Sequence, residues 1–181
     1  IMLVLPSDHL IKQNQMYIDT LKTAINVAKE GKNLVTIGIT PTYPETGYGY
    51  INYGHSNFSE KYSNVYEVER FVEKPDIEKA KEYLESGNYI WNSGMFVWKA
   101  STILDSFKEI LPDTYEGLMD IKKTIGKDIF EDVMFENYTK FRAESIDYGI
   151  MEKSSNIYTI PGTLGWEDVG SWLALERINK T

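Results

Sequence analysis

The sequence contains no cysteine, which excludes disulfides, cysteine zinc sites and thiol nucleophiles and fits a reducing cytoplasm. It also lacks any apolar run close to the roughly 20 residues that a membrane span requires. No cluster of lysine and arginine offsets the net charge of −8. Nucleic acid and anionic membrane surfaces are therefore not expected partners.

Histidine is scarce as well, with only His9 and His55 in the chain. The two lack the spacing of metal ligands, and no serine has the context of a catalytic triad. These absences disfavour nucleophilic catalysis by a group of the protein itself.

What is present is typical of a soluble globular protein: 181 residues, 42% hydrophobic and 25% charged. We find no repeat and no linker, so we expect one domain over residues 1–181. The apolar run at residues 1–5 predicts a strand buried on both faces. Because the chain begins within that strand, we expect it to be a fragment of a longer protein that supplies earlier strands.

The pattern along the chain alternates strands with amphipathic helices, which predicts a parallel α/β sheet. A helix with apolar residues at three- and four-residue spacing is expected at 14–30, followed by a strand at 34–40. Residues 54–63 have the composition of a polar turn. Further strands are expected at 48–53, 65–73, 89–99 and 157–160, and further helices at 76–86, 101–111, 112–124, 129–134, 146–154 and 171–178.

Residues 68–99 form a predicted crossover unit, a strand, a short helix and a second strand. Polar residues lie at the strand ends, where ligands bind in open α/β sheets. The first strand ends in Glu73-Lys74-Pro75, and the second opens with Trp91-Asn92-Ser93-Gly94. We expect this unit to bind a ligand.

Two aspartates are candidate magnesium ligands. Asp8 follows the first strand and Asp168 precedes the last helix, and paired carboxylates suit a cation that bridges phosphates. Taken singly, each is more often a turn or helix-capping residue.

The other candidates also have alternative explanations. Lys74 suits a phosphate and Glu73 suits sugar hydroxyls, although the two also fit a solvated ion pair. Gly49 allows close approach of a backbone amide to a ligand or serves a turn. Asn92 lies in an apolar strand, where its polar side chain requires a hydrogen-bond partner. Glu152 and Lys153 fit a second charged pair or a solvated helix face.

The order of the motifs in the chain is more specific than any single one, and it closely resembles the sugar-1-phosphate nucleotidyltransferases over nearly the whole chain. The motifs are Pro6-Ser7-Asp8-His9, Thr46-Gly47-Tyr48-Gly49-Tyr50-Ile51, Phe71-Val72-Glu73-Lys74-Pro75, Trp91-Asn92-Ser93-Gly94-Met95-Phe96, Ile146-Asp147-Tyr148-Gly149-Ile150-Met151-Glu152-Lys153 and Trp166-Glu167-Asp168-Val169-Gly170-Ser171-Trp172.

The resemblance implies a Rossmann-like mixed, mainly parallel sheet flanked by helices. Within the family the motifs are most similar to the branch that uses GTP and mannose 1-phosphate. It implies Mg²⁺-dependent in-line transfer that forms GDP-mannose and pyrophosphate, without a covalent enzyme intermediate. Another sugar phosphate or nucleotide, or a non-catalytic sugar-nucleotide-binding module, is the alternative. The sequence leaves open whether the protein is a homo-oligomer.

The resemblance also implies roles for individual residues. Asp8 and Asp168 are the implied metal ligands. The sugar phosphate is assigned to the crossover unit and to the residue Gly49 before it. The implied binding residues are Gly49, Glu73, Lys74, Asn92 and Gly94. Glu152 and Lys153 are expected near the same pocket.

One family feature has no match in the chain, the glycine-rich loop with a basic residue that wraps the nucleotide triphosphate. Gly47-Tyr48-Gly49 is too short for that loop, and no phosphate-loop lysine follows it. We therefore expect weak or no turnover by the 181 residues alone, and guanine selection is implied only by the family resemblance.

Overall fold

A computed structural model describes residues 1–170 and 172–179, and the chain divides into two compact units. One unit comprises Ile1–Lys99 with Asn156–Thr181, and the other comprises Ala100–Ser155. This division into compact units does not test the prediction of a single domain over residues 1–181, which stays a prediction. Among the described residues, no helix has the length and apolar character required to cross a membrane.

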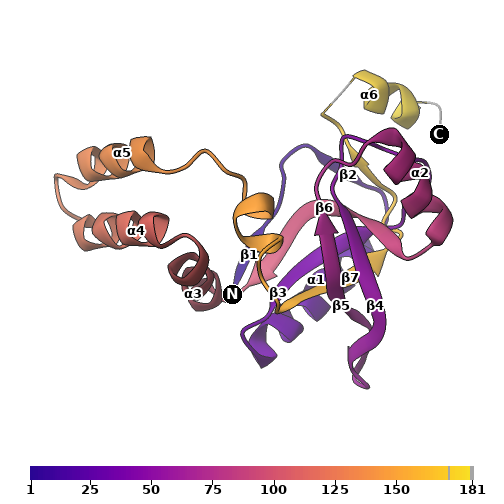
Figure 1. Ribbon diagram of the computed structural model, residues 1–181, viewed down its shortest axis with the longest axis horizontal. Coiled ribbons are helices and arrows are strands. Elements are labelled where there is room, and N and C mark those ends of the chain that lie inside the picture. Colours follow the sequence, from indigo (N-terminus) through magenta and orange to yellow (C-terminus); the bar gives the residue numbers. More distant parts are fainter. Residues whose placement is uncertain (171, 180–181) are drawn as a thin grey trace. The chain divides into compact units, whose positions relative to one another are not determined.

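The first unit is built on a six-stranded sheet in the order β1-β6-β3-β7-β5-β4, with an additional pairing between β4 and β6 (Figure 1). Its strands are β1 (Met2–Val4), β3 (Leu34–Ile39), β4 (Tyr50–Ser59), β5 (Tyr62–Val72), β6 (Tyr89–Trp98) and β7 (Ile157–Gly162). A separate two-stranded sheet joins β2 (His9–Ile11) to β8 (Trp166–Asp168). The helices of this unit are α1 (Asn14–Glu30), α2 (Ile77–Ser86) and α6 (Trp172–Asn179).

The predicted mixed α/β class is confirmed, but the prediction that the sheet is mainly parallel is wrong for the described strands. Only β3 and β7 pair in parallel, whereas the other pairings are antiparallel. The cause lies partly in residues 54–63, for which the sequence predicts a polar turn. Instead β4 continues to Ser59 and β5 returns from Tyr62, so the two strands form an antiparallel hairpin.

The first strand also differs from its prediction. The apolar run Ile1–Leu5 predicts burial on both faces, but the exposed fractions of its residues lie between 36% and 48%. Within the part of the chain that the structure describes, β1 pairs with β6 alone, at the edge of the sheet. The apolar run therefore predicts the strand correctly, but the prediction that both of its faces are buried is wrong.

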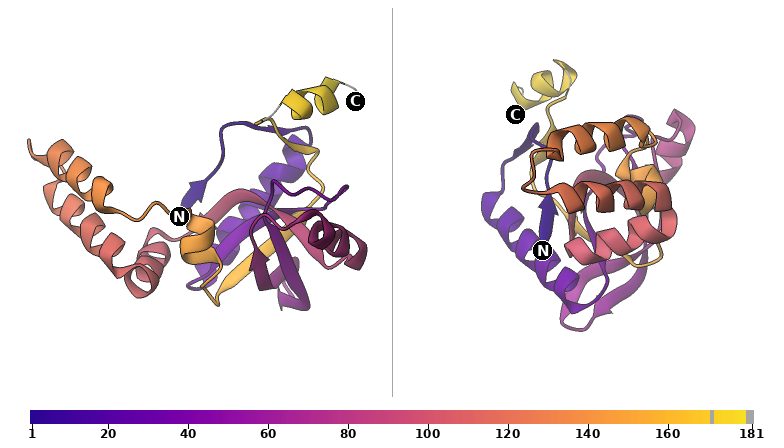
Figure 2. Two further views of the ribbon diagram at one scale, coloured as in Figure 1. Left: turned by 45° about the horizontal axis from the view of Figure 1, so that its top comes forward. Right: turned by 90° about the vertical axis from the view of Figure 1, so that its left-hand side faces the viewer.

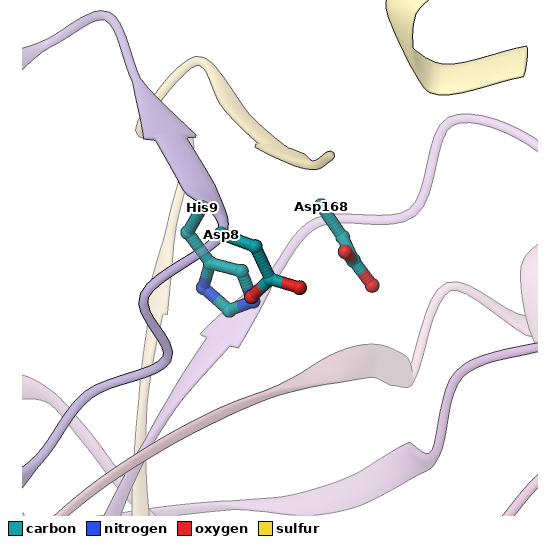
Figure 3. Close-up of side chains that lie close together, drawn as sticks. All are labelled: Asp8, His9 and Asp168. Atoms are coloured by element: carbon teal, nitrogen blue, oxygen red, sulfur yellow. The ribbon is translucent and has the colours of Figure 1, made fainter. Parts of the chain in front are cut away.

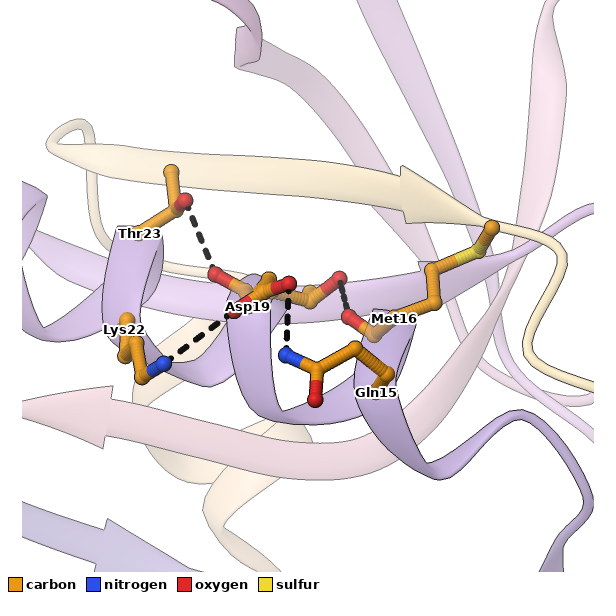
Figure 4. Close-up of polar contacts among 6 residues, drawn as sticks. Gln15, Met16, Asp19, Lys22 and Thr23 are labelled. Carbon is orange, nitrogen blue, oxygen red and sulfur yellow. Dashed lines mark hydrogen bonds and ion pairs between the residues drawn. The ribbon is translucent and has the colours of Figure 1, made fainter.

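Helix α1 is amphipathic as predicted. Its apolar side packs on the sheet, with Ala24, Val27 and Ala28 completely buried. On its exposed side, Asp19 accepts hydrogen bonds from Gln15 and Lys22 at 2.9 and 3.2 Å, as Figure 4 shows. Burial of the apolar side fixes the helix on the strands that carry the site.

The crossover unit predicted at residues 68–99 is present. Strands β5 and β6 run in the same direction because both are antiparallel to β4, which pairs with each of them. Helix α2 connects them and begins at the N-cap Asp76, whose carboxylate accepts a hydrogen bond from the Lys79 amide at 2.8 Å. It ends at Gly87, whose φ of 70° is left-handed and suits glycine.

The second unit is helical and contains α3 (Ala100–Ile110), α4 (Pro112–Thr124), α5 (Phe130–Lys140) and the π-helix η1 (Asp147–Met151). Proline begins α4 as predicted, and α4 and α5 lie side by side (Figure 2). The predicted helix at 146–154 is a single π-helical turn, a form found frequently at functional sites.

The cap of α2 provides a test of the fold. We expect Asp76→Ala to lower the free energy of unfolding by about 1 kcal/mol, because the Lys79 amide loses its acceptor. Chemical denaturation with a circular-dichroism readout measures the change. Asp76→Asn is the matched control, since asparagine caps equally well, and equal destabilisation by both variants would contradict this role.

Candidate functional site

The pairing of β2 with β8 brings the two candidate metal ligands together. His9 lies opposite Asp168 in this antiparallel pair, and the Val169 amide donates to the Asp8 carbonyl at 2.9 Å. The chain bends at Ser7 and Asp8, just before β2 begins. Residues from opposite ends of the chain thus meet through backbone hydrogen bonds.

The carboxylates of Asp8 and Asp168 and the imidazole of His9 offer ligand atoms that all lie within 4.8 Å of one another (Figure 3). The Gly170 amide donates to Oδ1 of Asp168 at 2.9 Å and orients that carboxylate. Two carboxylates within this distance fit a hard cation that prefers oxygen ligands, such as Mg²⁺. The residues present are therefore compatible with the magnesium site that the sequence predicts.

The presence of His9 in this cluster is not predicted from the sequence, and the imidazole contributes a hydrogen bond of its own. Its Nδ1 accepts from Nε1 of Trp166 at 3.0 Å. Burial lowers the pKa of His9, against the opposing effect of the charges on Asp168 and Asp8. A hydrogen bond accepted at Nδ1 requires that nitrogen to carry no proton. Spacing along the sequence gives no signal for this contact, because the pairing of β2 with β8 produces it.

A second cluster forms at the beginning of β4, between the end of β5 and the middle of β6. It unites three predicted sugar-binding residues. The backbone N–H of Asn92 donates to the backbone carbonyl of Gly49 at 2.8 Å. A Cβ added to Gly49 would lie only 2.5 Å from Oε2 of Glu73. A side chain at position 49 would therefore have to displace the Glu73 carboxylate from its present position.

The polar residues Asn92 and Ser93 within the apolar strand β6 have hydrogen-bond partners nearby. Oδ1 of Asn92 accepts from the Gly94 amide at 3.2 Å and lies 3.2 Å from the Thr36 hydroxyl. The Ser93 hydroxyl donates to the Ile37 carbonyl at 2.6 Å. The register between β3 and β6 shifts at this point, and Gly94 has a left-handed φ of 69°. The resulting bulge fixes the orientation of the Asn92 side chain.

Lys74 has the only positive φ, 45°, among the non-glycine residues that the structure describes. This conformation is costly for a lysine and doubly so before a proline. The Lys74 Nζ lies 3.7 Å from Oε1 of Glu73, and its side chain is 61% exposed whereas that of Glu73 is 11% exposed. Such strain, here in the connection between β5 and α2, is typical of functional sites.

Aromatic rings connect the two clusters. Trp166 contacts His9 and Tyr48 at centroid distances of 5.1 and 5.3 Å, and Tyr48 contacts Trp91 at 5.4 Å. Tyr48 and Trp91 directly precede Gly49 and Asn92 in the sequence. A small pocket of about 160 Å³ lies beside these rings, and its lining includes Thr40, Tyr43, Trp91, Thr163, Trp166 and Glu167.

Glu152 and Lys153 belong to the second unit, where they follow η1. The Glu152 amide donates to the Asp147 carbonyl at 2.9 Å, and the Lys153 Nζ lies 3.5 Å from Oε1 of Glu144. Both residues are exposed. Their assignment to substrate binding stays a prediction.

Comparison with known proteins gives a consistent result. The family model described as nucleotidyl transferase matches residues 1–181. A mannose-1-phosphate guanylyltransferase from Salmonella montevideo is 42% identical over 99% of this chain. One from Escherichia coli strain K12 is 39% identical over 99% of the chain. The chain spans 38% and 37% of the lengths of these two relatives.

Solved structures agree with this comparison. A crystal structure described as mannose-1-phosphate geranyltransferase from Thermus thermophilus superposes with a TM-score of 0.84 and 37% identity, over 99% of this chain and 49% of that one. A structure described as mannose-6-phosphate isomerase from Helicobacter pylori gives a TM-score of 0.74 and 31% identity, over 92% and 63% of the two chains.

The strained backbone of Lys74 makes a prediction about stability. We expect Lys74→Gly to have a free energy of unfolding about 1 kcal/mol higher than Lys74→Ala, because only glycine adopts the left-handed conformation without strain. Urea denaturation of the two variants measures the difference. Lys79→Gly and Lys79→Ala, on the helix that follows, form the matched control pair. There the order should reverse, because glycine destabilises a helix. A glycine variant less stable than its alanine counterpart at position 74 would show that the conformation is not strained.

Proposed function

Because the chain belongs to the nucleotidyl transferase family, we propose that it provides the metal and sugar-phosphate sites of a mannose-1-phosphate guanylyltransferase. The proposed reaction joins GTP and mannose 1-phosphate to give GDP-mannose and pyrophosphate. The observation that carries the proposal is that both predicted clusters occur in one compact unit, connected by contacting aromatic rings.

In the proposed reaction a phosphate oxygen of mannose 1-phosphate forms a bond to the α-phosphorus of GTP. The bond from that phosphorus to the oxygen bridging to the β-phosphate breaks, and pyrophosphate leaves. The bond that forms and the bond that breaks account for all electrons, so no protein nucleophile is required. The protein contributes position and charge neutralisation.

We assign the sugar phosphate to the second cluster. The ammonium group of Lys74, whose left-handed backbone follows β5, pairs with the phosphate. The Glu73 carboxylate accepts hydrogen bonds from sugar hydroxyls. The amide group of Asn92 donates to another hydroxyl, in an orientation fixed by the bonds to its Oδ1. Gly49 brings its backbone close to the sugar and leaves room for Glu73.

We assign Mg²⁺ to Asp8 and Asp168, whose carboxylates fit its preference for oxygen ligands. When bound, Mg²⁺ would neutralise charge on the phosphate groups. The Gly170 amide and the pairing of β2 with β8 hold the two carboxylates for this role. Guanine selection rests on the relatives and not on residues in the described sites.

The relatives also favour this function over the two alternatives. The relatives from Salmonella montevideo and Escherichia coli strain K12, which are 42% and 39% identical, are both named mannose-1-phosphate guanylyltransferases. A module that only bound a sugar nucleotide would not require two adjacent carboxylates. Soluble action on GTP and mannose 1-phosphate in the cytoplasm is part of the same proposal.

The metal assignment is tested with Asp168→Asn in the full-length protein. We expect at least an approximately 100-fold loss of Mg²⁺-dependent GDP-mannose synthesis, because one metal ligand loses its charge while the fold is retained. Asp76→Asn, the same exchange at the cap of α2, is the control and should keep the wild-type rate. Near-wild-type synthesis by Asp168→Asn would remove this residue from the metal site.

The sugar-phosphate assignment is tested with Gly49→Ala. The added Cβ would lie 2.5 Å from Oε2 of Glu73 and must displace that carboxylate. We expect the KM for mannose 1-phosphate to rise about 10-fold, because the sugar loses one or two hydrogen bonds. The KM for GTP should change little. Gly47→Ala is the matched control, because its Cβ would meet only the Glu45 side chain, at 3.2 Å or more. An equal rise in KM for both substrates would contradict the assignment.

A further inference from the structure

The hydrogen bond between Trp166 and His9 restricts what the imidazole can do. The indole Nε1 carries a proton and is only a donor, so the Nδ1 of His9 that lies 3.0 Å away must present its lone pair. A neutral imidazole has one protonated nitrogen, and here that nitrogen is Nε2. His9 therefore has no remaining lone pair for a metal ion.

This restriction has consequences because His9 lies among the candidate ligands. One of its ring nitrogens is within 4.8 Å of carboxylate oxygens of both Asp8 and Asp168. Two carboxylates and an imidazole form a ligand set that suits Zn²⁺, Co²⁺ and related ions, which bind such sites more tightly than Mg²⁺. Two carboxylates alone suit Mg²⁺.

We propose that Trp166 is a metal-selectivity residue, whose indole N–H holds His9 in a tautomer that cannot coordinate and so reserves the site for cations that prefer oxygen. The inference rests on the magnesium site of the proposed function and adds a mechanism of exclusion to it. Selectivity of this kind comes from withholding a ligand from the competing ion, in addition to binding the preferred one.

The position of Trp166 makes this hydrogen bond persistent. In β8 it lies opposite Ile11 and diagonal to His9 across the strand pair. Its side chain is only 8% exposed, and its ring also contacts Tyr48. The indole and imidazole planes meet at 84°. The indole cannot turn away from His9 without disrupting the packing around it.

The first experiment uses the unmodified chain. Long-range ¹H–¹⁵N correlation spectra of histidine distinguish the two neutral tautomers, and the chain has only two histidines. His9→Gln assigns the signals. We expect the proton of His9 on Nε2, with Nδ1 as an acceptor. A proton on Nδ1 would overturn the proposal, whatever the variants do.

The second experiment compares metal binding by calorimetry and by the absorption spectrum of Co²⁺. We expect Trp166→Phe to bind Co²⁺ at least about 10-fold more tightly than wild type, because His9 is released as a ligand. Affinity for Mn²⁺, used as a probe for Mg²⁺, should change much less. Adding His9→Gln to Trp166→Phe should abolish the gain.

Trp172→Phe is the matched control, because Trp172 is 87% exposed and the same exchange there should leave Co²⁺ affinity unchanged. Unchanged Co²⁺ affinity in a folded Trp166→Phe variant would overturn the selectivity role. The outcome is separable from the proposed function, because Mn²⁺ binding that is lost in Asp168→Asn would still support the magnesium site. Absence of Mn²⁺ binding by wild type would overturn both.

Discussion

The pairing of β2 with β8 is the constraint on which the site depends. Each strand has three residues, and an isolated two-stranded pair of this length is marginal in water. Additional bonds from the Lys12 and Gln13 amides to the carbonyls of Gly165 and Leu164 lengthen the pairing. Buried Leu164 and Trp166 attach it to the core. The carboxylates of Asp8 and Asp168 are thus positioned by packing that lies outside the main sheet.

Sequence patterns predict the features that depend on near neighbours. The amphipathic period of α1 and the bounds of α2, predicted at residues 76–86, both follow from residues within one or two turns. Features that depend on distant segments are not predictable in this way. The edge position of β1 and the long hairpin of β4 and β5 are set by pairing partners that local patterns do not identify.

The same distinction applies to the site. The order of motifs points to Gly49, Glu73 and Asn92, and the structure brings these three together. Histidine spacing carries no signal for His9. Its partner Trp166 lies near the other end of the chain, so only the strand register reveals the contact.

The aromatic contacts between the two clusters have a mechanical consequence. The proposed in-line transfer would require the sugar phosphate and the phosphates of the nucleotide to keep a fixed separation, and misplacement by about 1 Å costs rate. The rings of Trp166, Tyr48 and Trp91 form a continuous packed path from His9 to the residue before Asn92. Trp166 and Trp91 are buried and Tyr48 is partly buried, and closely packed rings are hard to compress, so this path limits changes in the spacing. Trp166, the residue proposed to restrict His9, therefore also supports the distance between the proposed metal site and the proposed sugar site.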